Sequence, residues 1–168
     1  VAPLLLVRDT RLALLKLQAS EDDRTDGPSE LDLQLHVGAR DLLLADRPRD
    51  AMALLEVLMR RYPRDLNAKI WMGRGHEMLG QPIHAMEMYD QVLRADWRAL
   101  YLEGRAEGVL AWTGEEGVRA GIANVARRQA LMLHYIGETE AAWALLRRIE
   151  ADVGSWPALT MAAEELSQ

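Results

Sequence analysis

The chain has 168 residues, of which 49% are hydrophobic and 27% are charged, and its formal net charge is −6. This length suits one domain, and this balance excludes a disordered chain. The net negative charge argues against nucleic-acid binding, because phosphate backbones are normally bound by a basic face. Ala, Leu, Arg, Glu and Met dominate while Phe is absent, so we expect an all-α fold.

Cysteine is absent, which excludes disulfides and thiolate chemistry. Its absence fits a reducing cytoplasm or a bacterial periplasm, and we take the cytoplasm as the working interpretation. No apolar run approaches the roughly 20 residues that a membrane-spanning helix needs, so we expect no membrane span. The chain begins at Val1 rather than Met, which is compatible with a processed or truncated chain.

Apolar residues recur at helical spacing along most of the chain. The acidic stretch Ser20–Ser29 includes Gly27-Pro28 and is predicted to be a loop. Trp156-Pro157 is predicted to open a last helix that caps the fold. In all, about nine helices are expected, over residues 4–18, 30–45, 48–61, 66–79, 82–95, 98–112, 117–136, 138–152 and 156–167.

Two blocks of the chain match each other when one is shifted by 34 residues. Small residues fall on small ones, apolar on apolar and proline on proline. The matching pairs include Ala39/Gly73, Arg40/Arg74, Asp46/Gly80, Pro48/Pro82, Ala51/Ala85, Leu55/Tyr89 and Leu58/Val92. A fixed period of this length predicts a repeat architecture in which each unit is a hairpin of two helices.

The repeat becomes irregular after Leu100 and resumes near Gly137. Gly114 lies 34 residues after Gly80, but Arg119 then occupies the position of Ala85. We expect one long helix over 117–136 that replaces two shorter ones. The predicted organisation is a single domain over 1–168, with an N-terminal helix and acidic loop (1–31), two clear units (32–99), degenerate units (100–154) and a capping helix (155–168).

The pattern of a small residue, a turn glycine, an alanine and a large apolar residue at a 34-residue period resembles the tetratricopeptide repeat (TPR) family. The best unit covers residues 67–96 and carries Gly73, Gly80, Ala85 and Tyr89 in register. It departs from the family pattern where Trp97 stands in the proline position. The resemblance implies an α-solenoid of stacked antiparallel hairpins, a right-handed superhelix whose first helices line a concave groove.

In this family, ligand contacts fall three residues before the small residue, one after it, and four to five after it. The resemblance therefore implies a partner-binding groove lined by His36, Arg40, Ile70, Arg74, Glu77, Met78, Trp112, Arg127 and Tyr135. The same positions also hold Leu43, Leu44 and His134. Arg40 and Arg74 lie one repeat apart, so we expect them to point the same way and to hold a carboxylate or the backbone of an extended peptide.

No motif in the sequence predicts catalysis, a cofactor or a metal site. His76-Glu77 begins like a zinc-protease helix, but Gly80 stands where the second histidine is needed. The four histidines lack the spacing of metal ligands. Gly73-Arg74-Gly75 is predicted within a helix, where its amides are already bonded, so it is not a phosphate loop.

These expectations favour a protein–protein interaction scaffold or adaptor that binds a peptide or a partner segment, such as a subunit of a bacterial assembly, secretion or envelope complex. One alternative is a self-assembling structural protein, with homo-oligomers formed through exposed Trp97, Trp112 or Trp156. Another is a regulatory domain of a larger enzyme or regulator. The partner and the pathway are left open.

Overall fold

The computed structural model describes residues 30–102 and 114–168, and every regular element in these ranges is an α-helix. The all-helical prediction is therefore confirmed for this part of the chain. The predicted helix 4–18 and the predicted loop at 20–29 lie outside the described residues. The helices are α2 (Glu30–Leu44), α3 (Pro48–Arg61), α4 (Leu66–Met78), α5 (Pro82–Arg94), α6 (Trp97–Leu102), α7 (Gly114–Tyr135), α8 (Thr139–Val153) and α9 (Pro157–Leu166).

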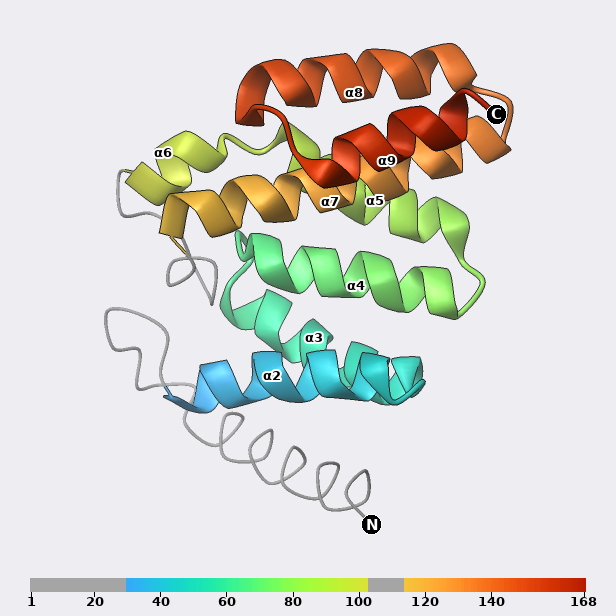
Figure 1. Cartoon of the computed structure of the whole chain (residues 1–168). Helices are drawn as coiled ribbons and strands as arrows, with labels where there is room; N and C mark the ends of the chain where they lie inside the picture. Colours follow the sequence, from blue (N-terminus) through green and yellow to red (C-terminus); the bar gives the residue numbers. More distant parts are fainter. Residues whose placement is uncertain (1–29, 103–113) are drawn as a thin grey trace.

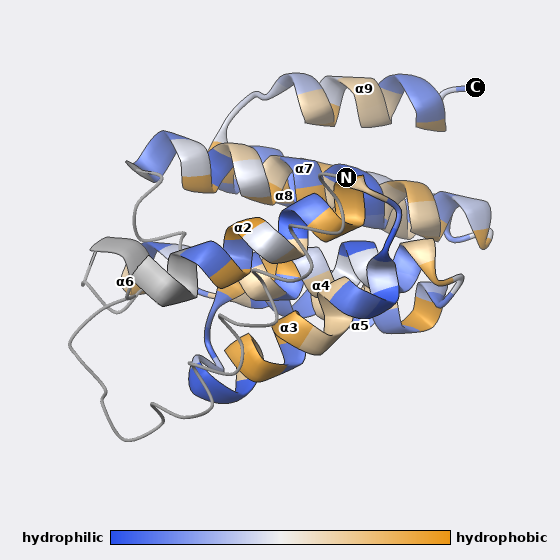
Figure 2. Ribbon diagram, turned by 90° about the horizontal axis from the view of Figure 1, so that it is seen from below, coloured by the Kyte–Doolittle hydropathy of each residue, from blue (hydrophilic) through white to orange (hydrophobic). Residues whose placement is uncertain are grey.

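Three pairs of consecutive helices pack against each other as hairpins: α2 with α3, α4 with α5, and α7 with α8. Further contacts join α3 and α2 to α4, α5 to α7, and α9 to both α7 and α8. Figure 1 shows the resulting order of the described helices, with α2 at one end, α4 above it, and α7, α9 and α8 at the other end. Apart from α6, the labelled helices carry both apolar and hydrophilic stretches, as amphipathic helices do (Figure 2).

In each of the three hairpins, the two helices are joined by a turn of the same geometry. One residue in each turn has a positive φ: Asp46 (58°), Gly80 (69°) and Gly137 (91°). The amide of the next residue donates a 2.8 Å hydrogen bond to a carbonyl five residues earlier, from Arg47 to Leu42, from Gln81 to His76 and from Glu138 to Leu133. This is the Schellman closure of a helix, for which glycine is the preferred residue.

Buried residues occupy the same register in each hairpin. A small residue of the first helix is followed at 12, 16 and 19 positions by three buried residues of the second helix. The sets are Ala39/Ala51/Leu55/Leu58, Gly73/Ala85/Tyr89/Val92 and Ala130/Ala142/Leu146/Ile149. In the third hairpin the small residue is Ala130 of α7. The helix α7 is therefore equivalent to the first helices α2 and α4.

The third hairpin is displaced along the sequence. The interval from Gly80 to Gly137 exceeds the 34-residue period by 23 residues, because it contains α6 and the long helix α7 in addition to α5. The long helix predicted at 117–136 is found as α7, at 114–135. The helix predicted at 98–112 is described only as α6, at 97–102, because residues 103–113 lie outside the described residues.

Candidate functional site

The first helices α2, α4 and α7 carry side chains at equivalent positions. Directly after the small residue, Arg40 is 47% exposed and Arg74 is 41% exposed. Arg40 pairs with the neighbouring Asp41 at 3.0 Å, and Arg74 lies 3.8 Å from Glu77. Both guanidinium groups are therefore held on their own helix and remain open to solvent on the other side.

One helical turn after these arginines, at the fifth position after the small residue, the side chains are apolar. Leu44 is 79% exposed and Tyr135 is 75% exposed, whereas Met78 is half-buried against the core of the first hairpin. We call these three residues, together with Arg40 and Arg74, the first-helix row.

The most exposed large apolar side chains of the described residues gather at the hairpin turns. Leu44 (79%), Ile83 (71%), Tyr135 (75%) and Ile136 (63%) each lie within three residues of a positive-φ turn residue. We call these four residues the turn edge. Figure 1 shows the three turns at the same end of their hairpins. Apolar side chains are thus exposed at each of the three turns along this side of the molecule, and Tyr135 and Ile136 are neighbours in the sequence.

Glu77 joins three helices. Its carboxylate accepts hydrogen bonds from the Tyr89 hydroxyl of α5 and, at 3.2 Å, from Arg128 of α7. Burial raises the pKa of the Tyr89 phenol, and the hydrogen bond to Glu77 raises it further. Glu77, predicted as a ligand contact, thus already serves as an acceptor that ties α4 to α5 and α7.

His36 lies in the interior, although its position was expected to line a groove. Its side chain is 2% exposed, and Nε2 lies 2.7 Å from Oδ2 of the fully buried Asp65. The other carboxylate oxygen of Asp65 accepts a 3.1 Å hydrogen bond from the Ala68 amide and so caps the start of α4. The need to partner this buried carboxylate explains why His36 faces inward.

The other predicted contacts are spread over different environments. Ile70 is half-buried against the core of the later hairpins. Arg127 donates a 3.2 Å hydrogen bond to Glu165 of α9. Tyr135 is exposed, with its ring centroid 5.8 Å from that of His134. Trp112 lies outside the described residues. Of the predicted contacts, Arg40, Arg74, Met78 and Tyr135 share register positions on the first helices, whereas His36 is buried.

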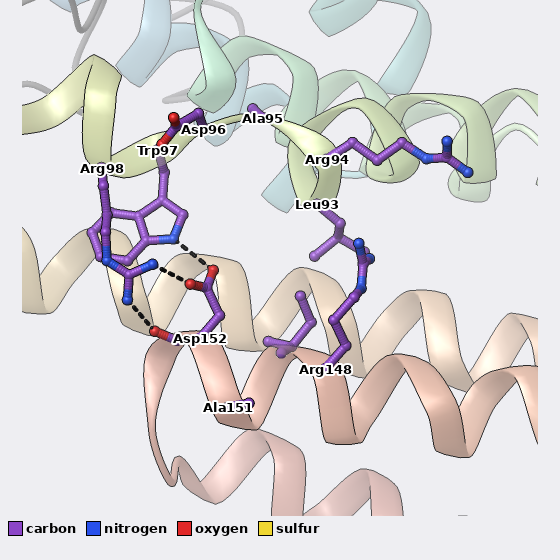
Figure 3. Close-up of a pocket in the computed structure, with 10 residues that line it drawn as sticks. Leu93, Arg94, Ala95, Asp96, Trp97, Arg98, Arg148, Ala151 and Asp152 are labelled. Carbon is purple, nitrogen blue, oxygen red and sulfur yellow. Dashed lines mark hydrogen bonds and ion pairs between the residues drawn. The ribbon is translucent and has the colours of Figure 1, made fainter.

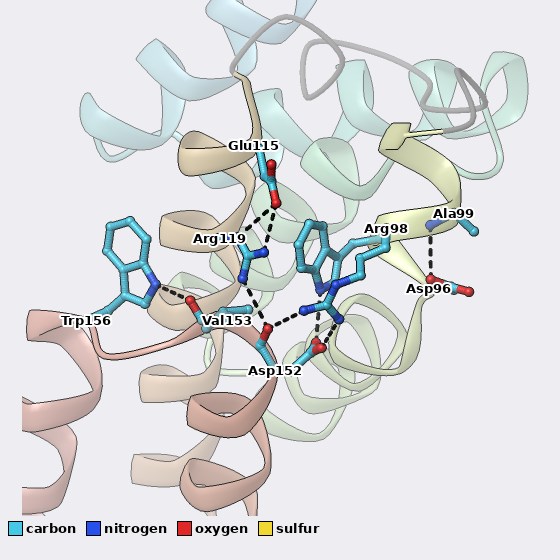
Figure 4. Close-up of polar contacts among 9 residues, drawn as sticks. Asp96, Arg98, Ala99, Glu115, Arg119, Asp152, Val153 and Trp156 are labelled. Atoms are coloured by element: carbon cyan, nitrogen blue, oxygen red, sulfur yellow. Dashed lines mark hydrogen bonds and ion pairs between the residues drawn. The ribbon is translucent and has the colours of Figure 1, made fainter.

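Trp97 was expected to be exposed, and this is wrong, because it is only 3% exposed. Its indole nitrogen donates a 2.9 Å hydrogen bond to Asp152 at the end of α8, and Arg98 also donates to that carboxylate (Figure 4). The guanidinium carbons of Arg98 and Arg119 lie 4.5 Å and 4.8 Å from the ring centroid, within the range of cation–π contacts. Trp97 thus fastens α6 to α7 and α8.

Asp152 is the acceptor at the centre of this contact. Burial on its own raises the pKa of the carboxyl, but hydrogen bonds from Trp97 and Arg98 and the positive charges of Arg98 and Arg119 lower it. The net result is a pKa below the ordinary value of 3.8, so the carboxylate stays charged in mildly acidic solution.

An open pocket of about 510 Å³ lies between the junction of α5 with α6 and the end of α8 (Figure 3). We call it the α8 pocket. No pattern in the sequence predicted it, since its walls come from segments about 50 residues apart that no motif links. Its polar lining consists of Arg94, Asp96, Arg98, Arg148 and Asp152, with Trp97 between them.

The described residues contain neither a candidate metal site nor a candidate membrane-spanning helix. No cluster of three or more His, Asp or Glu side chains there could hold a metal ion. None of the helices in the described ranges combines the length and the apolar character needed to cross a membrane.

Comparison with protein-family models, with curated proteins and with solved structures finds no match to this chain. The resemblance to the TPR family consequently depends on the residue pattern of the chain itself.

Proposed function

We propose that this chain is a TPR-like α-solenoid that acts as a protein–protein interaction scaffold and binds a segment of a partner protein along α2, α4 and α7. The repeated turn geometry and the repeated burial pattern support the solenoid. A stack of this kind offers matching positions of successive first helices along one face, which suits an extended or helical ligand.

The observation that carries the proposal is the exposure of apolar side chains in register at the ends of the first helices. Leu44 and Tyr135 are both at least three-quarters exposed, although folding normally covers such large side chains. Arg40 and Arg74 lie one helical turn before Leu44 and Met78, so guanidinium and apolar groups adjoin each other. The surface therefore suits an amphipathic partner segment with apolar anchors and acidic side chains.

The test starts from a partner captured on the immobilised chain from its source cells and identified by mass spectrometry. The double variant Arg40→Glu/Arg74→Glu is expected to abolish binding of that partner, because it replaces both exposed cations of the first-helix row with anions. Its helical circular-dichroism signal is expected to stay unchanged.

A matched control makes the same charge change elsewhere. Arg49 and Arg60 are exposed residues of the second helix α3, and Arg49→Glu/Arg60→Glu alters the net charge equally. This control is expected to bind the partner like the unmodified chain. Equal binding by both double variants, or equal loss in both, contradicts the proposal.

The turn edge also favours a second candidate function, which is self-assembly through these apolar residues. Sedimentation over a concentration range separates the two. A chain that associates with itself, and becomes monomeric when Tyr135 and Ile136 are both changed to Ser, supports self-assembly. A strict monomer removes this candidate.

A further inference from the structure

The α8 pocket lies at the opposite end of its helices from the turn edge. It is lined by the last residues of α5 and by the last turns of α8, from Arg148 to Asp152. Ile83 of the turn edge belongs to the first turn of α5, which places about 15 Å of helix between the two surfaces. A ligand in the α8 pocket would therefore contact different residues from one bound to the first-helix row.

The lining of the pocket holds one arginine more than it holds carboxylates. Three guanidinium groups (Arg94, Arg98, Arg148) face two carboxylates (Asp96, Asp152). Asp152 is occupied by Trp97 and Arg98, while Asp96 accepts a 3.0 Å hydrogen bond from the Ala99 amide at the start of α6. Neither carboxylate reaches the remaining two arginines.

Arg148 is available to a ligand through its whole guanidinium group, whereas Arg94 offers only its Nη atoms. Arg94 uses its Nε atom for Asp90, one helical turn earlier on α5, at 2.9 Å. Arg148 is exposed and forms no ion pair or hydrogen bond with any residue in the described part of the chain. In Figure 3 its side chain rises from α8 toward the α5 side of the pocket. Because Asp90 balances the charge of Arg94, the uncompensated cation of the pocket is Arg148, in a chain whose net charge is −6.

The rest of the pocket wall is apolar and firmly held. Leu93 and Ile149 contribute aliphatic surface and are themselves 8% and 2% exposed. Trp97 is fixed by its hydrogen bond to Asp152, as described above. Guanidinium groups beside an aliphatic wall suit a carboxylate carried on methylene groups, because the planar fork of arginine matches a carboxylate with two parallel hydrogen bonds.

We propose that the α8 pocket binds an acidic peptide segment of a partner protein, with Arg148 and Arg94 holding its glutamate or aspartate carboxylates. This is a second contact site, on the second helices, and it does not depend on the function proposed for the first-helix row.

The test uses a fluorescein-labelled hexaglutamate peptide and measures fluorescence anisotropy at low ionic strength. Arg148→Met is expected to weaken binding about tenfold, since it removes a charge-assisted hydrogen bond. The adjacent Arg147 is also exposed on α8 but does not line the pocket. Arg147→Met loses the same charge, so it is the matched control and is expected to change the affinity by less than about twofold.

Three results would overturn the inference: no binding by the unmodified chain, equal effects of Arg147→Met and Arg148→Met, or displacement of the peptide by inorganic phosphate at equal concentration of charge. The last would indicate a site for free anions. Arg40→Glu/Arg74→Glu is expected to bind hexaglutamate like the unmodified chain. Loss of binding in that variant would place the peptide on the first-helix row and would also overturn the inference.

Discussion

The ring of Tyr89 occupies the space that a side chain at Gly73 would fill. A Cβ atom built at Gly73 would lie 2.3 Å from Cε1 of Tyr89, and Tyr89 is fully buried. The other hairpins carry the smaller Leu55 and Leu146 at the position of Tyr89, and there the small residue is alanine. The size of one residue of the pair thus accounts for the size of the other.

Gly73→Ala is expected to destabilise the fold by about 1–2 kcal/mol in urea unfolding followed by circular dichroism. Overpacking a core destabilises by roughly 1–3 kcal/mol. The better helix propensity of alanine offsets up to about 1 kcal/mol of this cost. Gly121→Ala on α7 is the control, since a Cβ there meets nothing within 4 Å. It is expected to stabilise by about 0.5–1 kcal/mol. Similar gains in both variants would show that the Tyr89 ring is free to move.

Much of the helical architecture could be predicted from the sequence, because its signals are local. Proline at the first position of α3, α5 and α9, and glycine in two of the three turns, mark the helix ends in the residues themselves. The return of the repeat near Gly137 likewise predicted the helices on both sides of the third turn, despite the irregular interval before it. These signals depend on residues within one hairpin.

The candidate sites depend on contacts between distant segments, and for these the sequence carries no signal. His36 has the spacing of a groove residue, but the carboxylate that draws it inward, Asp65, belongs to the next hairpin. Trp97 follows the end of α5, and its sequence context is that of an exposed residue. The acceptor of its hydrogen bond, Asp152, lies 55 positions later in the sequence. The repeat register predicts which residues occupy equivalent positions. Whether such a residue is buried depends on the side chains of other helices that pack against it.

Asp65→Ala is expected to cost about 2–3 kcal/mol of unfolding free energy. It removes the helix cap of α4, worth about 1 kcal/mol, and leaves the buried His36 without its partner, worth roughly 1–2 more. Asp96→Ala is the comparison, because Asp96 caps α6 through the same type of hydrogen bond but is exposed. Its cost is expected to be about 1 kcal/mol. Equal costs would mean that the contact with His36 contributes nothing.

The stability that Asp152 contributes is expected to depend on pH. Because the pKa of Asp152 is lower in the folded chain than its ordinary value of 3.8, the contribution is complete above 3.8 and is lost as the pH falls through the lowered folded-state pKa. The unfolding free energies of the unmodified chain and of Asp152→Asn are expected to differ at pH 7 and to converge toward pH 2. A difference that stays constant over this range would show that the charge of Asp152 is irrelevant to stability.

Substitutions at the turn edge are expected to separate binding from stability. Tyr135→Ser removes a side chain that is 75% exposed, so the free energy of unfolding is expected to change by less than about 0.5 kcal/mol. Capture of the partner is expected to weaken about tenfold or more, since apolar anchors dominate interfaces of this kind. Met161→Ser on α9 is the control, because Met161 is also a large exposed apolar residue, at 46%, but belongs to the last helix and not to a hairpin turn. Equal partner capture by the two variants would mean that the turn edge has no special part in binding.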